Sequence, residues 1–158
     1  MKILMKRQLL LFALLLTSMA GMAQTADDLF REFKDKDGVQ FVNIGKEMMD
    51  FATGFVKEQE TKEVLKKMDF VRVLNIEGNK KTAQAFAKQS EKLKKGKYEP
   101  MVTTNDDGRT LILTRFEGED ICELLILTVE DDECALVQIG GKISPDDIQK
   151  LSEMTKNN

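Results

Sequence analysis

Residues 122–139 read CELLILTVEDDECALVQI, and this stretch decides the fold. Two apolar runs, 122–129 and 134–139, flank an acidic turn, which is the pattern of two strands joined as a hairpin. If Asp131 and Asp132 form a two-residue loop, Val129 faces Cys134 across the hairpin. Both runs are apolar at successive positions, whereas a strand with one face in water alternates apolar and polar side chains.

Two interpretations fit a hairpin that is apolar on both faces. Leu125, Leu127 and Leu136 fall on one face, whereas Leu124 and Ile126 fall on the other. Helices could cover both faces of a central strand pair, or one face could contact a second protein, including another copy of this chain. The second interpretation makes Leu125, Leu127 and Leu136 a candidate binding surface.

Further strands are expected upstream of this hairpin. Residues 98–104 and 109–116 each predict a strand, and the short turns between them allow only antiparallel neighbours. Pro100 favours a sheet edge for the first of these strands, because proline cannot donate a ladder hydrogen bond. Residues 39–44 and 70–76 are β-branched and aromatic and predict two earlier strands.

Helices are predicted by apolar residues at helical spacing and by capping residues ahead of them. Thr25 is a candidate cap for a helix at 26–33, Asn79 for one at 80–95, and Ser144 for a last helix that begins at Pro145. Between the two earlier strands, one helix face is expected to be buried through Met48, Met49, Ala52, Phe55 and Val56.

These elements together predict an α+β fold. Its sheet is an antiparallel β-meander of four C-terminal strands plus two earlier strands, and helices cover it. Cys122 and Cys134 would be offset along the hairpin by about seven residues, or about 23 Å at ~3.3 Å per residue. A disulfide needs Cα atoms within about 7 Å, so we expect two free, largely buried thiols.

The chain begins with the layout of a secretory signal peptide. Lys2, Lys6 and Arg7 precede an apolar run at 9–16, and small residues follow up to Ala23. The run is shorter than the ~20 residues of a membrane-spanning helix. We therefore expect cleavage after Ala23, removal of residues 1–23, and a single exported α+β domain at 24–158. That domain would be periplasmic or secreted and soluble, without a membrane span.

Composition limits the chemistry that is available. The 158 residues include no histidine, no tryptophan and two cysteines. Nucleophilic pairs that use histidine, imidazole metal sites and four-thiolate zinc sites are therefore excluded, and we expect no metal and no cofactor. Loss of the three basic residues of the signal leaves 21 basic and 27 acidic residues, a net charge of −6. This charge argues against binding to nucleic acid.

Charged residues gather in two segments. Residues 79–97 hold seven lysines and one glutamate, and four of the lysines can share a helix face: Lys81, Lys88, Lys92 and Lys95. This face is either simply solvated or a patch that attracts an anionic partner such as a lipid headgroup phosphate. Residues 117–133 hold eight acidic and no basic residues, and we expect them to form solvated surface.

Acidic pairs at predicted turns are the remaining candidates for chemistry: Asp35 and Asp37, Asp106 and Asp107, Asp131 and Asp132. Aspartate is favoured in turns for backbone reasons, and none of these pairs continues as a twelve-residue calcium loop. Because carboxylates pair in space rather than in sequence, a periplasmic hydrolase using carboxylates stays open as an alternative.

The order of these features resembles domain-of-unknown-function family 4252, a group of small exported bacterial envelope proteins. The residues that carry the resemblance are GMAQ at 21–24, the segment 39–49, FVRVLNIEG at 70–78 and ELLILTVEDDECALVQIGGKISPDDIQKLS at 123–152. The resemblance implies an exported α+β domain and supplies no catalytic residues. We therefore expect a non-enzymatic binding or interaction module of the envelope, with a protein partner or a homodimer as its complex.

Overall fold

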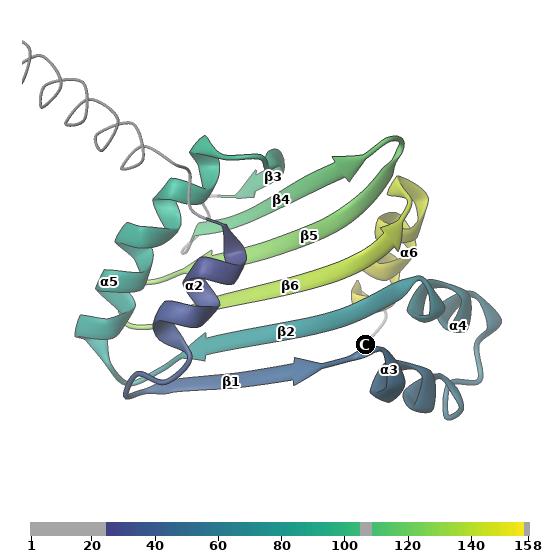
Figure 1. The fold of residues 1–158 in the computed structure, drawn as a ribbon, viewed down its shortest axis with the longest axis horizontal. Coiled ribbons are helices and arrows are strands. Elements are labelled where there is room, and N and C mark those ends of the chain that lie inside the picture. The colour runs from purple at the N-terminus through teal and green to yellow at the C-terminus, as the bar shows by residue number, and fades with distance from the viewer. Residues whose placement is uncertain (1–24, 105–108, 157–158) are drawn as a thin grey trace, which may run out of the picture.

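The computed structural model describes residues 25–104 and 109–156 (Figure 1). The expected signal peptide and the pair Asp106 and Asp107 lie outside these ranges. The described elements are α2 (Ala26–Phe33), β1 (Val39–Ile44), α3 (Lys46–Thr53), α4 (Gln59–Lys66), β2 (Met68–Ile76), α5 (Lys80–Ser90), the 3-10 helix η1 (Glu91–Lys95), β3 (Glu99–Thr104), β4 (Arg109–Glu117), β5 (Asp120–Val129), β6 (Cys134–Ile143) and α6 (Pro145–Lys156).

The six strands form one antiparallel sheet in the order β1-β2-β6-β5-β4-β3. Strands β3 to β6 are the expected meander, and β2 joins it beside β6. The α+β prediction is confirmed, as is the edge position of the strand that contains Pro100.

The register of the decisive hairpin is also confirmed, because Val129 pairs with Cys134. The ladder shifts between Ile121 and Glu123, so Cys122 lies at a bulge. Cys122 and Cys134 are both free thiols, as expected. Turn chemistry and side-chain alternation are local properties, which explains why the sequence could predict this pairing.

The helix caps follow from the residues at the helix starts. The Thr25 hydroxyl accepts the Asp28 amide at 3.3 Å while the Asp28 carboxylate accepts the Thr25 amide at 3.0 Å, a reciprocal capping box. Asn79 caps α5 through the Thr82 amide. The helix expected at 80–95 instead tightens into η1 after Ser90, whose hydroxyl donates to the Ala87 carbonyl at 2.8 Å and so competes with the α-helical bonding pattern.

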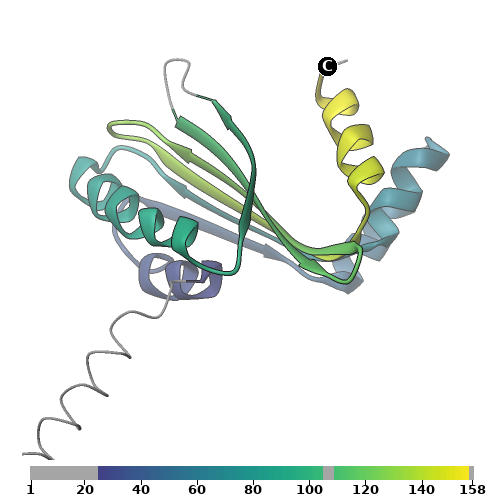
Figure 2. The same ribbon diagram turned by 90° about the horizontal axis from the view of Figure 1, so that it is seen from above.

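Helices lie on opposite faces at the two ends of the sheet (Figure 2). On the first face, α2 and α5 pack on the larger core, where the Phe33 and Phe86 rings meet edge to face at 5.2 Å. On the second face, α3, α4 and α6 pack at the other end of the strands on a smaller core that includes Met68 and Ile143. Among the described helices none has the length and apolar character needed to cross a membrane.

Candidate functional site

A line of apolar side chains crosses the second face of the sheet. The register places one residue from each of five adjacent strands side by side, and we call this set the apolar row: Val42, Val73, Val137, Ile126 and Ile112. Cross-strand partners point to the same face, so the five side chains form a continuous line. Four are half-buried, and Val42 at the sheet edge is 51% exposed.

The apolar row remains accessible because of where the helices sit. Helices α3, α4 and α6 lie at one end of the second face (Figure 2), on the smaller core, against which Val137 and Ile112 of the apolar row also pack. In the part of the chain that the structure describes, no helix lies over the opposite end of this face. A strand with one wet face normally places polar residues there, so an exposed Val42 and four half-buried valine and isoleucine side chains mark a surface suited to an apolar partner.

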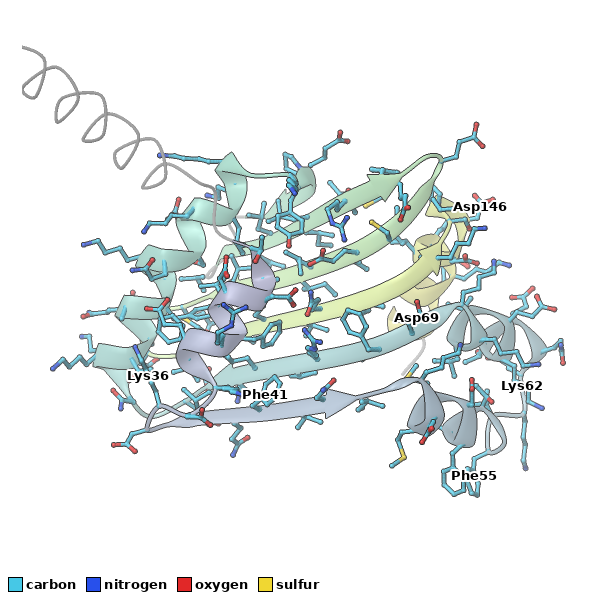
Figure 3. All side chains as sticks on the ribbon, viewed as in Figure 1. Lys36, Phe41, Phe55, Lys62, Asp69 and Asp146 are labelled. Atoms are coloured by element: carbon cyan, nitrogen blue, oxygen red, sulfur yellow. The ribbon has the colours of Figure 1, made fainter. Side chains whose placement is uncertain are left out.

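Three more apolar side chains are exposed, two on α3 and one just after its end. Met48, Phe51 and Phe55 are 59%, 65% and 75% exposed, and we call them the α3 patch. The Phe51 and Phe55 rings contact each other at 5.2 Å, and Figure 3 shows Phe55 pointing away from the sheet.

The prediction of a buried helix face in this segment is therefore wrong for most of the residues assigned to it. Of the residues assigned to it, Met49 is buried and Val56 half-buried, whereas Met48, Ala52 and Phe55 are exposed. Helix α3 ends at Thr53, so it is too short to keep Phe55 on the face that Met49 presents to the core.

The residues predicted as a binding surface lie elsewhere. Leu125, Leu127 and Leu136 are on the first face, where α2 and α5 cover them, and they are buried in the larger core. For this face the helix-covered interpretation holds, and the prediction of an exposed surface at these three leucines is corrected. On the opposite side of the same hairpin, Ile126 and Val137 are half-buried and therefore partly accessible.

The predicted lysine face is exposed but is not one α-helical face. Lys81 and Lys88 belong to α5, whereas Lys92 and Lys95 belong to η1, where the 3-10 geometry changes the angle between successive side chains. All four lysines are exposed, and their binding to an anion stays a prediction.

One member of the acidic segment is not solvated. Glu123 lies in the interior at 7% exposure, on the first face of the sheet. Its Oε1 accepts hydrogen bonds from the Tyr98 hydroxyl and from Gln138 Nε2, both at 2.8 Å, and its Oε2 accepts from Arg115 Nε at 3.0 Å. The expectation of a solvated surface is wrong for Glu123 because donors from β4, β6 and the segment before β3 satisfy the buried carboxylate.

The network around Glu123 shifts the pKa of its partners. Burial raises the pKa of Tyr98 well above its ordinary value, and the neighbouring Glu123 carboxylate raises it further. The hydrogen bond to Glu123 likewise raises the pKa of Arg115. Both shifts move the pKa values of Tyr98 and Arg115 further from neutrality, so neither of these two groups is tuned to transfer a proton near pH 7.

The network continues to an open cavity of ≈ 380 Å³ between α2 and β1. Arg72 Nη1 donates to Asp27 Oδ1 at 2.7 Å and to Gln138 Oε1 at 3.3 Å, and the guanidinium lies 4.7 Å from the centre of the Phe70 ring. Asp27 and Arg72 line the cavity together with Phe30 and Phe41, whose ring centroids are 5.6 Å apart.

The other buried carboxylate, Asp147, also has a structural role. It accepts the Ser144 amide at 2.9 Å at the start of α6 and is bridged by Lys67 Nζ at 3.0 Å. Among the described residues there is no group of three or more Cys, Asp and Glu side chains that could hold a metal ion. Asp35, Asp37, Asp131 and Asp132 are exposed.

Comparison with known proteins places the chain in a family. No curated protein and no solved structure matches it. The family model described as "Domain of unknown function (DUF4252)" matches residues 33–151, which is most of the chain and includes all six strands. The chain therefore belongs to the DUF4252 family.

Proposed function

We propose that this protein is an exported, non-enzymatic module of the cell envelope that binds a protein partner through the apolar row and the α3 patch. The apolar row is the observation that carries the proposal, because partly accessible β-branched side chains on five adjacent strands, with Val42 exposed at the edge, form the type of surface that a partner protein buries.

One feature supports export, and another supports a binding module over a hydrolase. The signal-peptide pattern at residues 1–23 supports export. Both buried carboxylates of the described chain, Glu123 and Asp147, already accept charge-assisted hydrogen bonds from basic side chains, so neither is poised to abstract a proton. The partner is either a second copy of this chain or a different envelope protein.

The proposal is tested with charged substitutions at its most exposed residues. Val42→Lys and the pair Phe51→Glu with Phe55→Glu alter the two surfaces, whereas Phe116→Lys changes an exposed aromatic residue outside them. Each purified variant serves as bait in a crosslinked envelope extract, and its sedimentation is measured at high concentration. Circular dichroism verifies the fold of every variant.

The wild-type protein and Phe116→Lys should capture the same partner or sediment as the same dimer, and the other variants should lose it. If Val42→Lys and the α3 variant keep every complex of the wild-type protein, the proposed surface is wrong. Export is tested separately by N-terminal sequencing of the protein recovered from the producing cell, where an intact Met1 in a cytoplasmic fraction would contradict it.

A further inference from the structure

The two edges of the sheet are protected to different degrees. At one edge, β3 carries Glu99 and Pro100, and its pairing with β4 is interrupted by a bulge after Pro100. Charges, prolines and bulges are the devices by which proteins stop another strand from adding to an edge. At the other edge, β1 has the sequence VQFVNI, without charge or proline, and pairs with β2 regularly over all six residues.

The backbone of β1 presents free hydrogen-bonding groups at this edge. The Gly38 carbonyl accepts the Glu77 amide at 3.1 Å. This bond determines which residues of β1 direct their backbone groups toward β2 and which direct them outward. Because residues of an antiparallel strand alternate between bonding to the partner and pointing away, Phe41 and Asn43 direct their amide and carbonyl groups outward. Within the described residues no helix or strand runs along the outer side of β1 (Figure 1).

The cavity between α2 and β1 adjoins this edge on the first face. Helix α2 contributes Asp27, Phe30 and Arg31 to its wall, and Lys34 follows directly after the helix. Figure 3 shows Phe41 next to α2. Asp27 neutralises Arg72 through their 2.7 Å contact, so the exposed Arg31 and Lys34 leave the cavity with a positive balance. Arg31 is also 3.7 Å from Asp28, a long and exposed pair that is worth little.

We propose that β1 and this cavity together bind an extended acidic peptide segment of another protein by strand addition. The outward groups of Phe41 and Asn43 supply the main-chain hydrogen bonds of a seventh strand. Alternate side chains of that strand lie beside Phe41 and Asn43, since directly opposed residues are about 5 Å apart. An acidic side chain there reaches Arg31 and Lys34. This is the recognition mode in which backbone bonds supply affinity and a side pocket supplies specificity.

Charge favours an acidic peptide over a second copy of this chain. A two-fold axis at the edge would pair β1 with β1 of the second copy and bring two positively charged cavities close together. The residues of β1 include no carboxylate to offset that charge. An acidic strand removes the repulsion and adds attraction that depends on salt concentration. This surface shares Val42 of β1 with the apolar row. The two proposals are therefore separated by the variants that lie outside β1, which are Lys34→Glu for the peptide and Phe51→Glu with Phe55→Glu for the partner protein.

The test uses the purified protein and a fluorescein-labelled synthetic peptide of alternating glutamate and valine with capped ends. Fluorescence anisotropy should show binding that weakens as salt is added. A matched peptide with lysine in place of glutamate should bind at least about tenfold more weakly. A third peptide, methylated at the amides that would face β1, should lose binding because it cannot form the ladder bonds.

Variants locate the site on the protein. Lys34→Glu should weaken binding of the glutamate peptide about tenfold, whereas the matched control Lys81→Glu on α5 should leave it unchanged. Asn43→Pro removes one outward amide at a position that an edge strand tolerates, and should abolish binding with an unchanged circular dichroism spectrum. If this variant unfolds, the methylated peptide still tests the ladder bonds.

Three results would overturn the inference. The first is equal binding of the glutamate and lysine peptides. The second is binding of the glutamate peptide that is unaffected by Lys34→Glu or by amide methylation. The third is a wild-type dimer that excludes the peptide and is not weakened by Lys34→Glu. In that case a second copy of the chain, rather than a peptide, would occupy β1.

Discussion

The Tyr98 hydroxyl donates a hydrogen bond of 2.8 Å to Glu123 Oε1 inside the larger core and accepts the Ala26 amide at 3.2 Å. One phenol thus connects the segment before β3, the middle of β5 and the first residue of α2. Glu123 is 7% exposed, and such donors replace the hydrogen bonds to water that its carboxyl group loses on folding.

Removal of this hydroxyl should destabilise the fold. Tyr98→Phe leaves the Glu123 carboxylate with one donor fewer and the Ala26 amide without its acceptor, so the free energy of unfolding should fall by about 1–3 kcal/mol. Urea unfolding measures the change. Gln138→Leu, which removes a different donor to the same oxygen, should give a loss of similar size, and a double variant should be non-additive. Unchanged stability in Tyr98→Phe would contradict the role of the network.

The raised pKa of Tyr98 predicts a specific alkaline response. Because the folded-state pKa lies above the ordinary value of 10.0, Tyr98 contributes stability that is fully present below that value and is lost as the pH rises toward the folded-state pKa. The stability difference between wild type and Tyr98→Phe should therefore shrink above pH about 10. A difference that stays constant up to the alkaline unfolding of both proteins would show that the phenol does not titrate with folding.

Asp147 predicts a response at acidic pH. Burial acts to raise its pKa, but the Ser144 amide, the Lys67 ammonium and the Ser144 hydroxyl together hold the pKa below its ordinary value. The ionised carboxylate therefore stabilises the fold above pH ~4, and this stability is lost as the pH falls through the folded-state pKa. Asp147→Asn should cost about 1–2 kcal/mol at neutral pH and less below pH ~4. A cost that is independent of pH, measured by urea unfolding at both values, would contradict the titration.

The two thiols should differ in reactivity in the native protein. Cys134 is 1% exposed, and burial raises the pKa of its thiol, whereas Cys122 is half-buried and lines an open cavity of ≈ 370 Å³. A thiol reagent should modify Cys122 in the folded protein and Cys134 only after unfolding. Mass spectrometry of peptides from the two samples identifies the sites. Equal labelling of both cysteines in the folded protein would show that the β6 strand opens.

The adjacent glycines of β6 should tolerate substitution unequally. A Cβ atom at Gly141 would overlap the Lys67 carbonyl, a backbone group that accepts the Lys142 amide at 3.0 Å and cannot move away alone. A Cβ atom at Gly140 would overlap the ring of Phe70, a half-buried side chain that can rotate. Gly141→Ala should therefore cost about 2–3 kcal/mol and Gly140→Ala about 1 kcal/mol. Thermal unfolding measures both, and the reverse order would contradict this account.

The sequence alone determined the local structure of this protein. The alternation of apolar residues and the turn at Asp131 and Asp132 predicted the pairing of Val129 with Cys134, and hydroxyl or amide side chains marked the starts of α2, α5 and α6. These features depend on residues close together in the chain, so their chemistry can be read from the order of the amino acids.

Only the tertiary structure decided which of these residues face solvent. Leu125 and Ile126 are equally apolar neighbours, yet helices cover the first and leave the second accessible, because coverage depends on where distant segments pack. The same limit explains why Glu123 is buried, because its donors Tyr98, Arg115 and Gln138 come from three separate segments of the chain. It also explains why Met48 and Phe55 are exposed. Apolar residues at helical spacing identify an apolar face, but they do not show on which side of the helix the sheet will lie.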